Sequence, residues 1–247
     1  MKDPGALADR TLAGVTAAIL AGGLGTRLRP VLADRPKVLA EVRGRPFLAY
    51  LLDQLVAVNL RYVVLCTGYL GEQVKATFGD SYGQLRLVYS QESSPLGTAG
   101  ALRLALPLLK SDPVLVMNGD SFYNVNLQAF WVYHGACKAS ATLALVRVSD
   151  PSRYGQVRVD THGAVISFQE KGSESNPGWI SAGVYLLTRA FLLRIPTRRV
   201  VSLEREVFPA WIGRGLYAYP GEGRFLDIGT PEAYASTEQF FAPETRI

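Results

Sequence analysis

The segment VTAAILAGGLGTRLRP, residues 15–30, joins a short apolar run to a loop that holds three glycines and two arginines. Residues 15–20 are apolar and partly β-branched, which is typical of a strand buried on both faces of a sheet. The glycines allow the backbone to approach an anion closely, and their N–H groups can donate to phosphate oxygens. Arg27 can add a bidentate contact. The segment therefore predicts a buried strand that ends in a phosphate-binding loop, with a plain tight turn as the alternative.

The loop differs from two common phosphate-binding loops. No Gly-Lys-Ser/Thr ends it, as one does in a P-loop, and residues 23–25 lack the third glycine of a dinucleotide fingerprint. The hypothesis of phosphate binding therefore depends on the glycines, on Arg27 and on the strand before them.

The chain after this loop alternates strands with helices. We expect helices at 47–58, 70–78 and about 98–109, and strands at 62–66, 85–89 and 114–117. Strands joined through helices form parallel βαβ units, and helices on both faces of a sheet explain strands that are almost wholly apolar. We predict an α/β fold with a doubly wound, mostly parallel, Rossmann-like sheet. Ligands of such sheets bind at the carboxyl ends of the strands.

The pattern changes after residue 126, where strand-like segments with hairpin-type spacers predict an added mixed or antiparallel sheet. These segments are 141–148, 156–159, 165–169 and 180–187, followed by a helical stretch at 202–212, an extended one at 217–219 and a helix at 231–240 with Thr230 as its N-cap. We expect residues 1–14 to be a flexible leader and residues 15–247 to form a single domain, with halves at 15–125 and 126–247. No C-terminal β-helix is expected, because the chain carries no hexapeptide repeat.

Composition and charge narrow the class of protein. The chain has 48% hydrophobic and 19% charged residues, as ordinary globular proteins do. Its formal net charge of +5 would suit a polyphosphate pocket. Acidic residues, Glu204 among them, interrupt the basic stretch at 198–214, which indicates a solvated face rather than a nucleic-acid-binding tract. No apolar run approaches the roughly 18 residues of a membrane span. We therefore expect a cytoplasmic protein with no nucleic-acid or membrane partner, and the sequence leaves a homodimer open.

Cysteines and histidines form no cluster typical of a metal or redox site. Cys66 and Cys137 lack CxxC spacing, and we expect both to be buried, reduced thiols. We assign structural or surface roles to His134 and His162. Any metal must therefore be held by oxygen ligands.

Three charged residues lie beside glycine or proline and are candidates for a phosphate and metal site. Lys37 follows Arg35-Pro36, and the proline predicts a stiff, extended segment that presents the lysine. Asp120 directly follows a predicted apolar strand, and Asp227 lies between an apolar stretch and a glycine. Proteins usually hold Mg²⁺ through one or two carboxylates together with substrate phosphates. A surface lysine and turn or capping aspartates are the alternatives.

Six motifs together resemble the sugar-1-phosphate nucleotidyltransferase family. In family order they are LAGGLGTRLRP at 20–30, RPK at 35–37, PLGTAGAL at 95–102, NGD at 118–120, EK at 170–171 and FLDIGTP at 225–231. The stretches GRPFLAYLLDQL, GYLGEQV, SRYG and GRFLDIGTPEAY look most like the D-glycero-α-D-manno-heptose 1-phosphate guanylyltransferases of that family. The resemblance implies a GT-A-like fold and an enzyme of nucleotide-sugar biosynthesis for surface polysaccharide. Such an enzyme joins an NTP, here GTP, to a sugar 1-phosphate, uses Mg²⁺ and releases pyrophosphate.

The resemblance also assigns roles to individual residues. It implies a nucleotide-binding half at 15–125 and a sugar-phosphate-binding half at 126–247. The implied nucleotide-binding residues are Ala21, Gly22, Gly23, Gly25, Thr26, Arg27, Pro95, Leu96, Gly97, Thr98, Ala99, Asn118 and Gly119. Gly155, Glu170, Lys171 and Ser181 match the sugar-phosphate side, Asp120 and Asp227 the metal ligands, and Arg27 and Lys37 the catalytic charges. Ser181 stands where many relatives have asparagine, which leaves the identity of the sugar open.

Other functions stay open beside this one. The sugar could be mannose or glucose 1-phosphate, and the nucleotide UTP, CTP or dTTP. A non-catalytic, nucleotide-sugar-binding regulatory subunit should lack Lys37 or one of the two aspartates, all of which this chain has. A glycosyltransferase would carry a DxD-type metal motif where this chain has Asn118-Gly119-Asp120.

Overall fold

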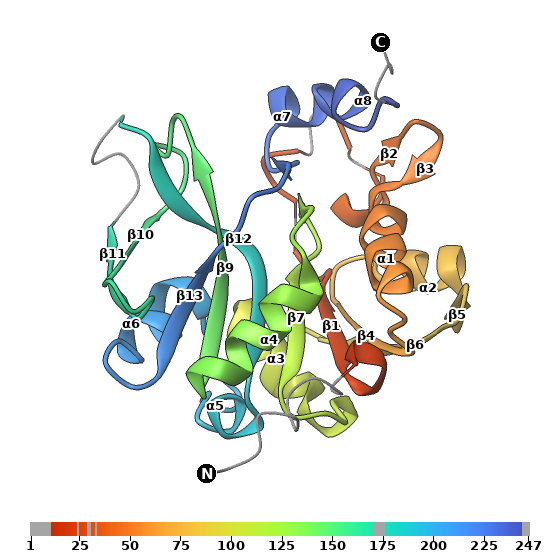
Figure 1. Cartoon of the computed structure of the whole chain (residues 1–247). Helices are drawn as coiled ribbons and strands as arrows, with labels where there is room; N and C mark the ends of the chain where they lie inside the picture. The colour runs from red at the N-terminus through yellow and green to blue at the C-terminus, as the bar shows by residue number, and fades with distance from the viewer. Residues whose placement is uncertain (1–10, 24, 29–30, 33, 170–175, 244–247) are drawn as a thin grey trace.

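The computed structural model describes residues 11–23, 25–28, 31–32, 34–169 and 176–243 (Figure 1). The strands are β1 (Thr16–Leu20), β2 (Glu41–Val42), β3 (Arg45–Pro46), β4 (Tyr62–Thr67), β5 (Ser81–Tyr82), β6 (Leu85–Gln91), β7 (Val114–Asn118), β8 (Ser121–Tyr123), β9 (Ala141–Val148), β10 (Gln156–Val159), β11 (Val165–Gln169), β12 (Gly178–Leu187), β13 (Leu216–Pro220) and β14 (Phe225–Asp227). The α-helices are α1 (Phe47–Ala57), α2 (Gly71–Phe78), α3 (Gly97–Ala105), α4 (Leu127–Cys137), α5 (Arg189–Leu193), α6 (Phe208–Ala210), α7 (Pro231–Ala235) and α8 (Thr237–Phe240).

The parallel part of the central sheet has the order β6-β4-β1-β7. Ala18 of β1 lies beside Val64 of β4 on one side and Val116 of β7 on the other. The chain thus moves outward from β1 through β4 to β6 and then crosses back to β7. This reversal is a topological switch point, and it places the ligand crevice of a doubly wound sheet at the carboxyl ends of β1 and β7.

The second half of the chain continues the same sheet with strands of both directions. β12 pairs antiparallel with β7, β9 pairs antiparallel with β12, and β13 is parallel to β9. β10 and β11 form an antiparallel hairpin beside β12 (Figure 1). The predicted mixed addition to a parallel sheet is confirmed, and it forms a direct extension of that sheet.

Helices cover both faces of the sheet. Successive residues of a strand point to opposite faces, so neighbouring residues of one strand contact different helices. Ala17 and Ile19 of β1 belong to one buried cluster with α1, α2 and α4, whereas Ala18 belongs to a second cluster with α3, α5 and α6. Both clusters are almost entirely aliphatic and aromatic, and burying these side chains is the main contribution to stability. The predicted doubly wound α/β architecture is confirmed.

Several elements differ from the sequence-based expectation for identifiable reasons. Helix α4 was not expected, since its apolar residues surround the helix: Phe130 is buried while Val132 is 49% exposed. The predicted helix 202–212 is a π-helix, Leu203–Val207, followed by the short α6. Pro209 cannot donate the hydrogen bond that would continue a regular helix there.

Part of the segment expected to be a flexible leader is packed against the fold. Leu12, within the segment assigned to the leader, lies in a 3₁₀ turn and is only 1% exposed. Residues 1–10 and the EK motif at 170–171 lie outside the described residues. None of the described helices is long and apolar enough to cross a membrane.

The approach of β7 to β1 predicts a position that tolerates no side chain. The Gly119 N–H donates to the Leu20 carbonyl at 2.9 Å, and a Cβ on residue 119 would lie 2.6 Å from that oxygen. Gly119→Ala should therefore lower the free energy of unfolding by about 1–3 kcal/mol, as overpacking does. Gly14→Ala, where a Cβ would meet nothing within 4 Å, should change it by less than about 0.5 kcal/mol. Urea unfolding of both variants checks this, and equal losses would contradict the tight approach.

Candidate functional site

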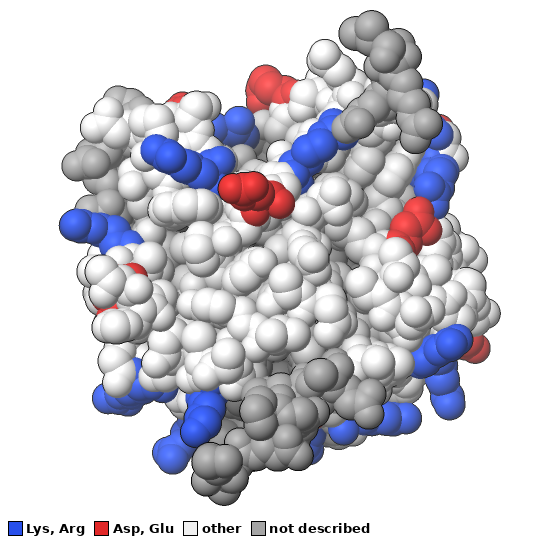
Figure 2. Space-filling model, viewed as in Figure 1, with Lys and Arg blue, Asp and Glu red and all other residues white. Residues whose placement is uncertain are grey.

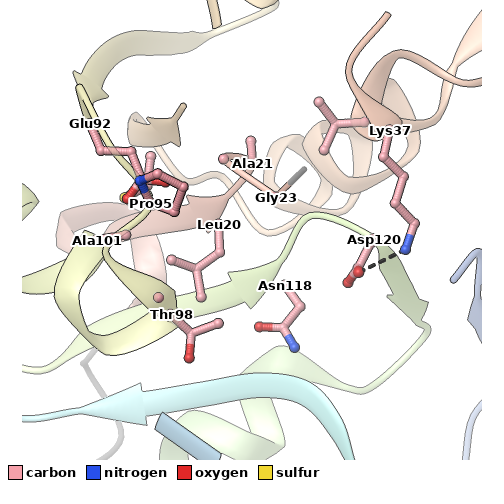
Figure 3. A pocket seen from close by; sticks show the side chains of 14 residues that line it. Leu20, Ala21, Gly23, Lys37, Glu92, Pro95, Thr98, Ala101, Asn118 and Asp120 are labelled. Atoms are coloured by element: carbon pink, nitrogen blue, oxygen red, sulfur yellow. Dashed lines mark hydrogen bonds and ion pairs between the residues drawn. The ribbon is translucent and has the colours of Figure 1, made fainter. Parts of the chain in front are cut away.

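A pocket of about 250 Å³ opens at the switch point between β1 and β7. Strand ends, the loop before α3 and the first turns of that helix form its walls (Figure 3). Its lining residues are Leu20, Ala21, Gly22, Gly23, Lys37, Val38, Cys66, Glu92, Pro95, Gly97, Thr98, Ala101, Asn118 and Asp120. The position agrees with the expected crevice at the carboxyl ends of the parallel strands.

An ion pair marks one end of the pocket. Lys37 Nζ donates to Asp120 Oδ2 at 2.8 Å, and the lysine side chain is only 11% exposed while that of the aspartate is 45% exposed. Pro36 has the predicted extended backbone, with φ −61° and ψ 144°, and Lys37 begins the 3₁₀ turn that follows. Lys37 is therefore held facing the pocket, which rules out the alternative of a free surface lysine.

A second aspartate lies beside this ion pair. β14 pairs with β8 so that Asp227 is opposite Ser121, and the Ile228 N–H donates to the Asp120 carbonyl at 3.0 Å. Burial, and then the negative charge of Asp120, raise the pKa of Asp227, while Lys37 and the Gly229 N–H at 2.6 Å act in the opposite direction. Two carboxylates that repel each other in a partly buried place form a donor set that suits a hard divalent cation.

The glycines of the loop reach both ends of the pocket: Gly22 lies beside Glu92 and Gly25 beside Lys37. A Cβ on Gly22 would lie 3.0 Å from Glu92 Oε1, whereas one on Gly23 would meet nothing within 4 Å. Gly25 has a φ of +57°, and its Cβ position is 3.6 Å from Cβ of Lys37. The loop therefore combines a tight contact on the strand side with open backbone beside the ion pair, the arrangement expected of a phosphate cradle.

A carboxylate stands at the opposite end of the pocket. Figure 3 shows Glu92 and Pro95 at one end and the Lys37–Asp120 pair at the other. Glu92 Oε2 accepts the Leu96 N–H at 3.0 Å, and burial raises the pKa of the carboxyl. Sequence reasoning missed Glu92, although it directly follows β6 just as Asp120 closely follows β7, so the same strand-end rule would have identified it.

The structure brings together only part of the residue set that the resemblance implies. Nine of them line the pocket: Ala21, Gly22, Gly23, Lys37, Pro95, Gly97, Thr98, Asn118 and Asp120. Described residues of the set that do not line it are Gly25, Thr26, Arg27, Leu96, Ala99, Gly119, Gly155, Ser181 and Asp227. Ala99 and Gly119 are buried and pack against neighbouring backbone, and Arg27 Nη2 lies 3.3 Å from the Cβ position of Gly229, beside Asp227. Glu170 and Lys171 lie outside the described residues.

The thiols and the buried histidine take no part in this arrangement of charges. Cys66 is buried as expected, whereas the expectation was wrong for Cys137, which is only half-buried. Burial raises the pKa of the Cys66 thiol to about 12, so the side chain lines the pocket as an apolar group. Burial lowers the pKa of His134 to about 4, and its ring lies 2.7 Å from the Thr142 hydroxyl.

On the face drawn in Figure 2, the described Lys and Arg side chains lie mainly around the edge and form no continuous basic stripe.

Comparison with known proteins gives one family and a consistent set of relatives. The family model described as nucleotidyl transferase matches residues 16–244. Mannose-1-phosphate guanylyltransferase of Mycobacterium tuberculosis is 38% identical over 224 residues, which cover 89% of this chain and 62% of that protein. D-glycero-alpha-D-manno-heptose 1-phosphate guanylyltransferase of Aneurinibacillus thermoaerophilus is 34% identical over 90% of this chain and 96% of that protein. The chain thus spans about three fifths of the mannose relative and nearly all of the heptose relative.

A solved structure has the same fold. The crystal structure of HddC from Yersinia pseudotuberculosis complexed with GMP-PN superposes with a TM-score of 0.80 and 28% identity. The match covers 92% of this chain and 100% of that one.

The raised pKa of Asp227 predicts that its charge costs stability. An acid whose pKa in the folded protein exceeds its ordinary value of 3.8 destabilises the fold as the pH rises from that value through the raised one. Asp227→Asn keeps the acceptor for the Gly229 N–H and should raise the Tm near pH 7 by roughly 1–4 °C. The gain should disappear when the pH falls below the ordinary value.

Asp150→Asn is the matched control, because hydrogen bonds from Ser152 lower the pKa of Asp150. That variant should not gain stability near pH 7. Thermal unfolding of both variants between pH 3 and pH 8 tests the pair, and an Asp227→Asn protein with a lower Tm at neutral pH would contradict the electrostatic argument.

Proposed function

Because the chain belongs to the nucleotidyl transferase family, we propose that it transfers GMP from GTP to a sugar 1-phosphate and releases pyrophosphate. The pocket at the switch point is the observation that carries this proposal. Its lining includes a glycine-rich strand end, the held Lys37 and the carboxylate of Asp120, and Asp227 lies beside Asp120; these features support a ligand site where a doubly wound sheet binds its ligand.

The charges of the pocket favour one orientation of the nucleotide. The phosphates belong at the end with Lys37 and Gly25, where a cation and backbone N–H groups are available. Glu92, at the opposite end, would repel a phosphate, so the nucleobase belongs there (Figure 3). Pro95 and Ala101 supply apolar surface for its ring.

The chemistry of Glu92 favours guanine among the bases. An ionised carboxylate only accepts hydrogen bonds, and the two oxygens offer about four lone-pair directions. Among the described residues, the Leu96 N–H is the one group that donates a hydrogen bond to this carboxylate. Guanine presents two adjacent donors, N1–H and the 2-amino group, which a carboxylate accepts together, whereas uracil, thymine and cytosine present donors beside acceptors. The relatives named as guanylyltransferases support the same base.

The proposed reaction is an in-line displacement that needs no general base. The sugar phosphate oxygen is already anionic at neutral pH, so it forms the new bond to the α-phosphorus of GTP directly. The bond between that phosphorus and the oxygen bridging it to the β-phosphorus breaks, and pyrophosphate leaves with the electron pair. Lys37 acts by holding charge beside the α-phosphate, and the glycine loop by orienting the triphosphate, which are the main contributions in phosphoryl-type transfer.

Asp120 and Asp227 are the residues that would hold Mg²⁺, which when bound supplies positive charge to the phosphates. Two observations support their fit to the ion: both are hard oxygen ligands on adjacent elements, and burial, followed by the charge of Asp120, raises the pKa of Asp227. The family generally uses a divalent metal. The free thiols Cys66 and Cys137 fit a reducing compartment such as the cytoplasm.

The sugar is D-glycero-α-D-manno-heptose 1-phosphate in our proposal, with mannose 1-phosphate as the second candidate. The heptose relative supports the first, since this chain covers 96% of it, and the mannose relative supports the second. Ser181 on β12 is half-buried and has a shorter side chain than the asparagine common at this position, which leaves more room beside the sugar.

The direct test is a matrix of four NTPs against heptose, mannose and glucose 1-phosphates, scored by pyrophosphate release with Mg²⁺. We expect GTP with the two manno-configured sugars to give a kcat/KM at least about tenfold above every other pair. Nucleotide binding without pyrophosphate from any pair would indicate a non-catalytic binding protein instead.

Lys37 should affect the chemical step more than binding, because its charge is most useful when charge redistributes. We expect Lys37→Ala to lower kcat on the order of 10²-fold, while the Kd of a non-hydrolysable GTP analogue rises less than about tenfold. Arg35→Ala, whose exposed guanidinium pairs with the adjacent Asp34, is the matched control. A Lys37→Ala enzyme with normal kcat and only a higher KM would refute this role.

Glu92 should distinguish GTP from ITP, which lacks the 2-amino group. The wild-type enzyme should prefer GTP in kcat/KM by about tenfold, the value of one charged hydrogen bond. In Glu92→Gln this ratio should fall toward one, because an amide accepts at one atom only. Glu72→Gln, on the exposed N-terminal turn of α2, is the control. An unchanged ratio in Glu92→Gln would remove Glu92 from base recognition.

A further inference from the structure

A carboxylate outside the pocket lining contacts hydroxyl groups from three elements of the fold. Glu204 lies on the π-helix Leu203–Val207 and is half-buried. Its carboxylate accepts hydrogen bonds from three hydroxyl groups. Thr98 Oγ1 at 2.8 Å and Ser202 Oγ at 3.1 Å donate to Oε2, and the Tyr185 hydroxyl donates to Oε1 at 3.2 Å. The expectation of a solvated charge is therefore wrong for Glu204, because the π-turn directs it inward.

The three hydroxyls belong to different parts of the site. Thr98 lines the pocket in the first turn of α3, and its Oγ1 also accepts the Leu203 N–H at 2.8 Å. Tyr185 is fully buried on β12, and Ser181 Oγ donates to its hydroxyl at 3.4 Å. The side chain of Asn118, which lines the pocket, also hydrogen-bonds to that hydroxyl. One carboxylate thus bridges the nucleotide side at Thr98 and the strand that carries Ser181.

The loop before α3 depends on the same segment through its backbone. The Val201 N–H donates to the Leu96 carbonyl at 2.8 Å, and the Ala99 N–H donates to the Val201 carbonyl at 3.0 Å. Gly97 has a φ of +73°, and a Cβ there would lie 2.5 Å from the Val201 carbonyl oxygen. Residues 201–204 therefore form the support against which the loop is packed.

The charge of Glu204 is met by hydroxyl dipoles, not by a cation. Among the described residues no Lys or Arg forms an ion pair with it, whereas its neighbour Glu206 pairs with Arg199 at 3.0 Å on the surface. The buried Tyr185 hydroxyl has a pKa well above its ordinary value, because of burial and then of the nearby Glu204 charge. β12 also shifts its register against β9 between Ser181 and Tyr185, an irregularity of the kind found beside active sites.

We propose that Glu204 is a positioning residue that fixes the nucleotide side through Thr98 and the sugar-phosphate side through Tyr185 and Ser181. The proposal rests on the proposed function for the identity of the two ligands. It predicts that loss of the carboxylate weakens both substrates at once, while loss of either hydroxyl weakens one of them.

The test compares variants that separate the two arms. Thr98→Val should raise the KM for GTP about threefold to tenfold and leave that for the sugar phosphate within twofold. Tyr185→Phe should raise the KM for the sugar phosphate more than that for GTP, even though its hydroxyl also contacts Asn118. Glu204→Ala should raise both KM values about tenfold, and Glu204→Gln should recover much of this loss, since hydroxyls can rotate to accept from an amide. Arg205→Ala, whose side chain is exposed on the same π-helix, should leave both values unchanged.

Circular dichroism and the cooperativity of unfolding establish that each variant is folded. A folded Glu204→Ala with both KM values near those of the wild type would overturn the proposal. So would KM changes in Arg205→Ala equal to those in Glu204→Ala, since these would follow from damage to the helix alone. If Glu204→Ala does not fold, the KM values of Thr98→Val and Tyr185→Phe test the proposal. It is overturned if the two variants change the KM for GTP and the KM for the sugar phosphate in the same proportion.

The failure of the proposed function would look different. In that case the wild type releases no pyrophosphate from any NTP and sugar phosphate pair. Calorimetric Kd values of GTP and of the sugar phosphate for the same variants then replace the KM values and decide the role of Glu204 by the same pattern.

Discussion

The ends of β1 and β7 can lie side by side at the pocket because residue 119 has no side chain. The Gly119 N–H bonds to the Leu20 carbonyl, and the Cβ of any other residue would collide with that oxygen and with Val38. This contact sets the floor of the crevice at the topological switch point. Asp120, one residue further, is thereby placed in reach of Lys37, which comes from a separate segment 83 positions earlier in the chain.

The charges of the site lower the stability of the ligand-free protein and favour the binding of a ligand. Asp227 is partly buried beside the like charge of Asp120, and Lys37 offsets only part of that repulsion. The two hydrophobic clusters show no such conflict, because they are almost entirely aliphatic and aromatic. A functional site is expected to contain such destabilising contacts within a structure that is otherwise well packed.

The sequence identifies those parts of the site that are local in the chain. The strand before Ala21, the extended Pro36 and the strand before Asp120 each carry their own signal, so Lys37 and Asp120 could be found from pattern and position. The neighbourhood of Asp227 and Asp120 depends on the pairing of β14 with β8, two short strands about 100 residues apart, and no local pattern predicts it.

Other features resisted prediction for different physical reasons. Helix α4 has apolar residues on all sides, so its period is hidden. Glu204 stands among charged residues that favour a surface position, and only the π-turn directs it toward Thr98 and Tyr185.

In the proposed binding mode the nucleotide spans the pocket with its base at Glu92 and its phosphates at Lys37. A crystal structure with a non-hydrolysable GTP analogue and Mg²⁺ measures this directly: guanine within hydrogen-bonding distance of Glu92 and the triphosphate at Lys37 would support it, and the reverse orientation or binding outside this pocket would contradict it.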